Sequence, residues 1–226
     1  MMVRLDEGEI GVAERSPIPV FLTERGRLSL LGGHPALDFT NTVDWRGRAE
    51  PDEFLTGYDV LLRWATRIGL LGAAEEAALL RRAAAAPDEG ARLLETVLTF
   101  REAFYRLLVA QTRGTLARPE DLATLNDALR RFPPPSEIVS SGASYAWKSA
   151  PVETALARPV ALLARIAAEF LVSPELHRLR LCEGSDCGWL FLDLSPNRRR
   201  RWCSMEGCGN RAKARRHYQR QRDDPA

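Results

Sequence analysis

Apolar residues recur three or four positions apart through most of the middle of the chain, the spacing that places them on one face of a helix. The longest such stretch, 89–112, predicts an amphipathic helix that packs against a core. Its predicted inner face carries Leu93, Val97, Phe100, Phe104, Leu107 and Leu108. Shorter stretches predict further helices over residues 56–69, 73–86, 119–131 and 151–171. The pattern predicts a mainly α-helical domain with small β elements.

Individual residues refine the predicted bounds and faces of these helices. Thr56 and Asp59 are spaced as a capping pair, which predicts that the first of the five begins at Thr56. Pro159 predicts an interruption of the helix over 151–171. The helix over 119–131 is expected to carry its apolar residues Leu122, Leu125 and Leu129 on one side.

Two segments are predicted to be non-helical. Residues 1–27 are rich in Glu, Gly and Pro around one short apolar patch, so they are interpreted as an N-terminal arm with one strand. Residues 136–148 alternate around a Ser-Gly pair, which predicts a hairpin with strands 137–140 and 144–148. Tyr145 and Trp147 of this hairpin are expected to be packing residues.

Residues 28–48 predict a helix that begins at Pro35, because two glycines precede it and proline suits a first helical position. Ala36, Phe39, Thr40 and Val43 would face inward. A polar stripe that ends in an aromatic residue consists of Asp38, Asn41, Thr42 and Trp45. Such a stripe can line a small-molecule pocket, but it also suits a hydrogen-bonded network or a hydrated face. His34 is interpreted as structural.

The four cysteines of the chain stand in two pairs near the C-terminus. Cys182 and Cys187 have four residues between them, as have Cys203 and Cys208, and each pair ends in Cys-Gly. Four thiolates on two short loops suit one tetrahedral zinc ion and leave no open position for catalysis, so the predicted site is structural. A redox-active thiol cluster is the main alternative. Disulfides are not expected, because the chain does not begin like a signal peptide and a cytoplasmic location is predicted.

The residues around the cysteines predict a small module. A strand over 188–194, a turn and a second strand over 198–202 would form a hairpin, followed by a helix over 211–222. This order predicts a treble-clef-like zinc module. Leu190, Leu192 or Leu194 is expected to contact the helical domain, and Ala214, His217, Tyr218 and Gln221 would form the helix face that packs on the hairpin. The predicted organisation is an arm (1–27), a helical domain (28–178) and a zinc module (179–226).

Positive charge is concentrated in this module. Residues 198–222 hold ten basic residues and one acidic residue, a net charge of +9 in a chain whose total is +2, so the remainder carries −7. Guanidinium groups pair with phosphate oxygens, so the cluster favours a nucleic-acid partner. The candidate contacts are Arg198, Arg199, Arg200, Arg201, Arg211, Lys213, Arg215, Arg216 and Arg220. An acidic protein partner, RNA and simple solvation remain alternatives.

Two motifs resemble a known family. Cys-Gly-Trp-Leu-Phe-Leu-Asp from Cys187, Arg-Arg-Trp-Cys-Ser-Met around Cys203 and Cys-Gly-Asn-Arg-Ala-Lys from Cys208 are similar to the CGNR zinc finger of bacterial proteins. Residues 32–45 resemble the opening of the ABATE domain that precedes this finger in stress-induced transcription regulators. The resemblance implies zinc at the four cysteines and DNA binding by the basic residues.

Other function classes find little support in the sequence. The chain has no run of 18 apolar residues that would predict a membrane span. It also lacks the common catalytic motifs, and its three histidines are scattered, so an enzyme is not expected. We expect a cytoplasmic regulator whose finger binds DNA, while the helical domain senses a signal or forms a homodimer. Oxidation of the thiolates, with release of zinc, is a variant of this hypothesis.

Overall fold

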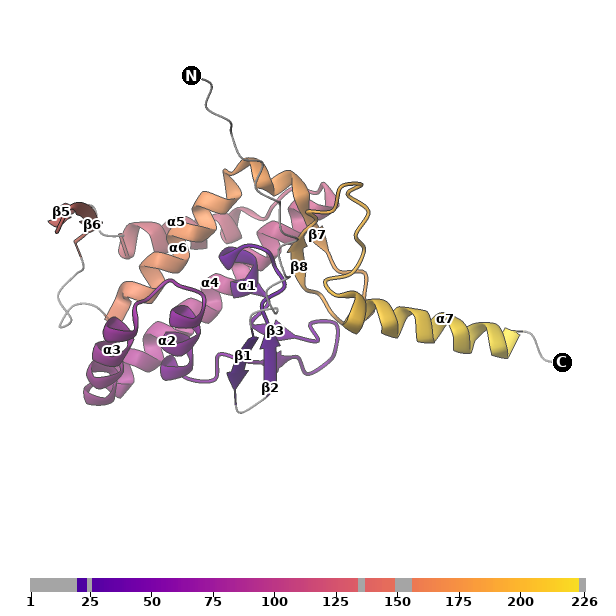
Figure 1. Ribbon diagram of the computed structural model, residues 1–226, viewed down its shortest axis with the longest axis horizontal. Helices are drawn as coiled ribbons and strands as arrows, with labels where there is room; N and C mark the ends of the chain where they lie inside the picture. The colour runs from indigo at the N-terminus through magenta and orange to yellow at the C-terminus, as the bar shows by residue number, and fades with distance from the viewer. Residues whose placement is uncertain (1–19, 24–25, 134–136, 149–155, 224–226) are drawn as a thin grey trace, which may run out of the picture.

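The computed structural model describes residues 20–23, 26–133, 137–148 and 156–223 (Figure 1). The helices in these ranges are α1 (Pro35–Thr40), α2 (Tyr58–Arg67), α3 (Ala73–Ala85), α4 (Pro87–Arg113), α5 (Pro119–Arg131), α6 (Arg158–Leu171) and α7 (Asn210–Asp223). A 3-10 helix, η2 (Pro174–Arg178), and a π-helical turn, η3 (Met205–Gly209), complete the helical elements described. The antiparallel strand pairs are β1 (Val20–Thr23) with β2 (Gly26–Ser29), β3 (Val43–Asp44) with β4 (Asp52–Glu53), β5 (Ile138–Ser141) with β6 (Ser144–Trp147), and β7 (Leu179–Leu181) with β8 (Leu190–Leu192).

The core forms around α4, which packs against α1, α2, α3, α5 and α6. Its predicted inner face is buried. Phe100 lies 5.8 Å from Phe39 and 6.1 Å from Phe104 between ring centroids, and Phe39 also contacts the buried Trp64. Each large apolar side chain buried in this way contributes about 1.5–3 kcal/mol to folding. The predicted mainly helical fold is confirmed.

Proline accounts for two differences at helix ends. Helix α4 begins at Pro87, two residues before the predicted start, because a proline in the first turn loses no hydrogen bond. For the same reason Pro159 lies in the first turn of α6 and does not interrupt that helix. The predicted start of α6 at residue 151 lies outside the described residues.

One other detail was wrong. Helix α2 begins at Tyr58 after an extended Gly57, so Thr56 and Asp59 do not form its cap. On α5, Leu125 is buried and Leu129 packs against the core, whereas Leu122 is 48% exposed.

Helix α1 begins at Pro35, as predicted. His34 is its N-cap, and its Nδ1 accepts a hydrogen bond of 3.1 Å from the Ala36 backbone amide. The His34 ring lies 4.7 Å from that of Phe170, and burial lowers the pKa of this histidine. The residues expected to face inward, Ala36, Phe39, Thr40 and Val43, are buried.

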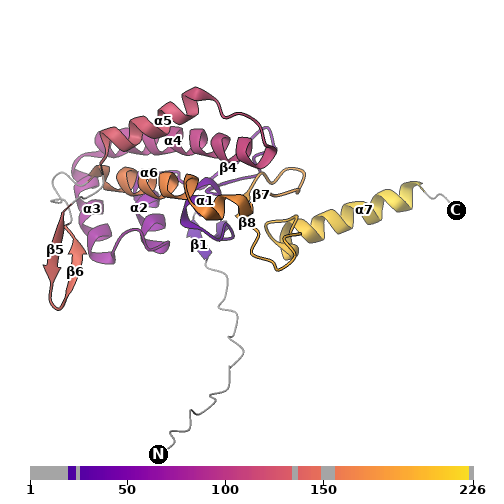
Figure 2. The same cartoon turned by 90° about the horizontal axis from the view of Figure 1, so that it is seen from above.

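Hairpin β5–β6 lies at the end of the molecule opposite to α7 (Figures 1 and 2). The two strands pair as predicted, with Val139 opposite Ala146. Tyr145 is 78% exposed, so it is not the packing residue that the sequence suggested. Both views show the hairpin standing away from the helices.

The C-terminal module differs from its prediction in strand pairing. Strand β8 pairs with the preceding β7, with Leu181 opposite Leu190, and residues 198–202 form no strand. The buried Asp193 explains the difference, because its carboxylate accepts hydrogen bonds from the backbone amides of Ser195 (3.0 Å) and Arg200 (2.9 Å). These contacts hold the chain after β8 in a loop.

Helix α7 leaves the body of the protein and extends into solvent (Figures 1 and 2). The face predicted to pack on the hairpin, Ala214, His217, Tyr218 and Gln221, is exposed. The helix has almost no large apolar side chains to bury, so it has little tendency to pack. Only its first turns touch the zinc module.

Candidate metal centre and basic helix

Two loops bring the cysteine sulfurs together. Cys182 and Cys187 lie on the loop between β7 and β8 (residues 182–189, the first zinc loop), and Cys203 and Cys208 lie before and within η3 (residues 198–209, the second zinc loop). All four Sγ atoms lie within 4.8 Å of one another, and Cys203 Sγ is 3.7 Å from the Sγ atoms of both Cys187 and Cys208. Tetrahedral zinc with bonds of about 2.3 Å separates its sulfurs by about 3.8 Å. The donor set therefore fits one zinc ion.

Hydrogen bonds favour the thiolate form of Cys182 and Cys208. Cys182 Sγ accepts from the backbone amides of Gly184 (3.4 Å) and Cys203 (3.3 Å), and Cys208 Sγ accepts from the Arg211 guanidinium (3.0 Å). Hydrogen bonds with the neighbouring thiols, together with the Cys203 amide, lower the pKa of Cys182 despite its burial. Such outer contacts orient the ligands and offset the negative charge of a zinc–tetrathiolate centre.

Glycine is required at position 188, directly after the second cysteine, both by the backbone conformation there and by the closeness of neighbouring atoms. Its φ is +72°, a conformation that favours glycine, and a Cβ there would lie 2.7 Å from the Cβ of Arg46. The loop can therefore approach the helical domain closely. The first Cys-Gly pair thus provides both a turn and a contact.

Asn41 joins the helical domain to the zinc module. Its Nδ2 donates to the Leu190 carbonyl (2.8 Å) and its Oδ1 accepts from the Leu190 amide (3.0 Å). The side chain thus pairs with β8 as a neighbouring strand would, and it is buried. Further hydrogen bonds cross the same boundary from Trp189 Nε1 to the Val43 carbonyl (2.9 Å), from the Leu192 amide to the Gly32 carbonyl (2.9 Å) and from the Tyr105 hydroxyl to the Gly188 carbonyl (2.8 Å).

The expected apolar contact between module and domain is present. Leu190 and Leu192 are buried at this boundary, whereas Leu194 is 59% exposed. The zinc module is therefore docked on the helical domain, and the start of α7 has a defined place relative to that domain.

The predicted polar stripe is mostly used inside the protein. Asp38 Oδ1 accepts from the Gly32 amide (2.8 Å), and burial raises the pKa of Asp38 to about 6 although this hydrogen bond lowers it. Thr42 donates to the Phe39 carbonyl (2.7 Å). Trp45 is half-exposed and lines a cleft beside the zinc site. A ligand pocket at the four stripe residues stays a prediction.

Replacing Asn41 by alanine is expected to destabilise the protein by about 2–5 kcal/mol, because the buried amide and carbonyl of Leu190 each lose a partner. Urea unfolding of the zinc-loaded variant measures this loss. Asn126, exposed on α5, provides the matched control, and its alanine variant should stay within about 0.5 kcal/mol of the native protein. If Asn41 served only a ligand pocket, its variant would match the Asn126 control.

The basic residues of the zinc loops have separate roles. Arg200 donates from Nε to the Trp202 carbonyl (2.9 Å) and from Nη2 to the Cys203 carbonyl, so it fixes the second zinc loop. Arg201 donates to Glu183 (2.6 Å), which offsets its charge. Arg198 and Arg199 are exposed on the loop before them.

The basic residues of α7 lie mainly in solvent. Arg211, Lys213, Arg215, Arg216 and Arg220 are exposed, as is Arg222. Arg211 contacts Cys208 and lies over the Trp45 ring, with 4.6 Å from its Cζ to the ring centroid. Arg215 donates to the Ser185 hydroxyl (2.6 Å). The helix therefore carries cations along its whole length, and its first turns are tied to the zinc loops.

The side chains that hold the first zinc loop against the helical domain could not be identified from the sequence. Arg46 pairs with Glu102 (2.6 Å) and lies over the Tyr105 ring (3.9 Å from Cζ to the centroid). Its backbone amide also donates to the Cys187 carbonyl (3.3 Å). A charged residue in a loop gives no indication of such burial.

A helical domain that carries a four-cysteine, zinc-binding module with a basic helix defines a zinc-finger protein. Comparison with protein-family models gives two matches: residues 33–174 match ABATE, described as "Putative stress-induced transcription regulator", and residues 178–221 match the CGNR zinc finger. The chain belongs to the ABATE family, as its sequence suggested. No curated protein matches it.

These matches bear on several predictions. The CGNR finger and the four gathered sulfurs together identify one structural zinc ion as the cofactor. The descriptions name a regulator and a zinc finger, and neither names an enzyme. In the described part of the chain, no helix has the length and apolar character needed to cross a bilayer.

Proposed function

We propose that this protein is a zinc-dependent transcription regulator that binds duplex DNA through α7 and the exposed arginines of the zinc loops. The observation that supports this most directly is the position of α7. It starts at the zinc site, extends away from the body and exposes six cationic side chains within 14 residues (Figure 2). A solvated helix with this charge and no apolar face suits a phosphate backbone.

The dimensions of α7 suit a groove of DNA. Fourteen residues span about 21 Å, and a single helix fits the major groove, which is about 12 Å wide. Lys213, Arg216 and Arg220 follow one stripe of the helix, so they can contact successive phosphates. Asn210, at the beginning of the helix, offers an amide of the kind that contacts base edges.

The docked helical domain gives the basic helix a fixed starting direction. Zinc binding contributes on the order of 10 kcal/mol to the folding of such modules, which holds η3 and the first turn of α7 in place. A change in the helical domain, caused by a signal or by dimerisation, can reach α7 through Asn41 and β8. We include in this proposal that the helical domain senses a signal or forms a dimer.

A competition experiment tests the choice of partner. Fluorescence anisotropy of a labelled duplex, titrated with zinc-loaded protein, is expected to show binding that unlabelled duplex competes more effectively than hairpin RNA does. Preferential competition by the RNA would contradict DNA as the partner. A protein partner that is captured after nuclease treatment, with no duplex binding, would also contradict it.

A further inference from the structure

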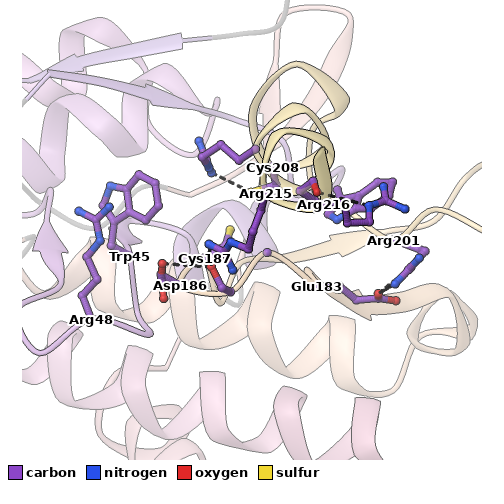
Figure 3. A pocket seen from close by; sticks show the side chains of 14 residues that line it. Trp45, Arg48, Glu183, Asp186, Cys187, Arg201, Cys208, Arg215 and Arg216 are labelled. Carbon is purple, nitrogen blue, oxygen red and sulfur yellow. Dashed lines mark hydrogen bonds and ion pairs between the residues drawn. The ribbon is translucent and has the colours of Figure 1, made fainter. Parts of the chain in front are cut away.

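A cleft of about 470 Å³ lies between the helical domain and the zinc module, and it shares Arg211, Arg215 and Arg216 with the basic surface assigned to DNA. The loop after β3, the first zinc loop and the first turns of α7 form its walls. Figure 3 shows Trp45 and Arg48 on one side, Glu183 and Arg201 on the opposite side, and Cys187 between them. The volume is within the range of small-molecule sites.

The aromatic wall of the cleft is Trp45. The guanidinium of Arg48 lies over its ring, with 3.7 Å from Cζ to the ring centroid. The Trp45 backbone has a φ of +54°, which is unusual for a bulky residue, and such backbone strain is concentrated at functional sites. The half-exposed indole therefore already accepts a planar, charged group on its face.

The loop that presents Trp45 is fixed to the first zinc loop. The Gly47 amide donates to the Asp186 carbonyl (3.1 Å), and a Cβ on Gly47 would lie 2.8 Å from Asp186 Cα. This close approach of two backbones sets the position of the indole relative to the zinc module. The aromatic wall is therefore preorganised, which lowers the entropic cost of ligand binding.

The charges of the cleft favour an anion. Five arginines line it, together with Glu183, Asp186 and two zinc ligands that share the negative charge of the metal centre. Arg201 pairs with Glu183 and Arg211 with Cys208, so these two cations are largely offset. The hydrogen-bond and ring contacts of the other three arginines are with neutral groups: the Trp45 ring for Arg48, the Ser185 hydroxyl for Arg215 and the Ala212 carbonyl for Arg216. Arg48 also interacts electrostatically with the Asp44 carboxylate.

We propose that this cleft binds a nucleotide, with the base stacked on Trp45 and the phosphate held by Arg215 and Arg216. Base stacking on aromatic side chains and guanidinium pairing with phosphate are the two recognition modes that the cleft offers together. A base over the indole replaces the Arg48 guanidinium, which is then free to contact the phosphate. The nucleotide is either a free mononucleotide or an unpaired nucleotide of a single strand.

Calorimetry on the zinc-loaded full chain tests this proposal with separate probes. A nucleoside monophosphate is expected to bind at least about tenfold more tightly than the matching nucleoside or inorganic phosphate, because each of these keeps only one of the two kinds of contact. A short single-stranded oligonucleotide forms the second arm. Trp45-dependent binding of the mononucleotide identifies a free ligand, and Trp45-dependent binding of the oligonucleotide alone identifies an unpaired nucleotide.

Variants distinguish the site from non-specific attraction to a basic protein. Trp45→Ala should weaken binding by about fivefold to a hundredfold, the range expected for base stacking, and Trp45→Phe should restore most of it. Tyr145→Ala, on the distant β5–β6 hairpin, provides the control. Zinc content measured on each variant shows whether the module is intact. Equal affinities for nucleotide, nucleoside and phosphate, or unchanged nucleotide binding by an intact Trp45→Ala variant, would overturn the proposal.

Discussion

Removal of zinc from the intact protein is expected to unfold the segment from Cys182 to Cys208 and to weaken duplex binding by at least about thirtyfold. The four ligands are buried and hold the two zinc loops together, so the ion supplies on the order of 10 kcal/mol that the hydrogen bonds of these loops with the helical domain cannot replace. Isolated helices of the length of α7 are marginal in water, so α7 loses its order as well. Ordering it again on DNA costs about 2–5 kcal/mol, which accounts for the lost affinity.

Chelator titration measures this effect directly. Metal release, hydrogen exchange of residues 182–209 and anisotropy of a labelled duplex are followed together, and addition of zinc should restore all three. The Cys203→Ser variant should resemble the chelated protein, because the remaining three sulfurs hold zinc less tightly. A reduced, metal-free protein that keeps this segment protected and binds duplex at full affinity would refute the assigned role of zinc.

Loss of two cations from α7 is the second large expected effect. Lys213→Ala combined with Arg220→Ala should weaken duplex binding by roughly fifty- to a hundredfold at about 0.1 M salt, since each phosphate contact contributes nearly one power of the salt concentration. Both side chains are exposed and lie on one stripe of the helix. Neither lines the cleft beside Trp45, so this test is independent of the nucleotide proposal.

The matched control removes equal charge from another surface. Arg81 on α3 and Arg92 on α4 are exposed arginines of the helical domain, and their double alanine variant should bind duplex with nearly native affinity. Equal losses in both double variants would mean that net charge, and not α7, determines binding. Arg200 is not suitable for such a test, because its contacts with the Trp202 and Cys203 carbonyls make it part of the zinc loop.

Local patterns predicted much of this fold. The spacing of Leu93, Val97 and Phe100 depends only on helical geometry, and the structure confirms α4 to within two residues at its start. The two cysteine pairs likewise predicted a metal site, because four thiolates at this spacing have few uses other than binding a metal. These features could be read from neighbouring residues alone.

Features set by distant contacts could not be predicted in this way. Strand β8 pairs with β7 because Asn41, 149 positions away, holds Leu190, and because Asp193 turns the following residues into a loop. Arg200 and Arg220 have the same side chain, yet one is tied to the zinc loop and the other is exposed. The polar residues Asp38, Asn41, Thr42 and Trp45, which lie in α1 and after it, have the same sequence pattern whether they line a pocket or hold a strand.

The salt dependence of duplex binding by the intact, zinc-loaded protein tests the central claim most directly. If the exposed cations of the zinc module and α7 neutralise about five phosphates, a plot of log affinity against log salt concentration from about 50 to about 200 mM should be linear, with a slope near −4 to −5. The slope should become shallower by about 2 in the Lys213/Arg220 double variant. A slope near zero in the intact protein would contradict binding of DNA through this basic surface.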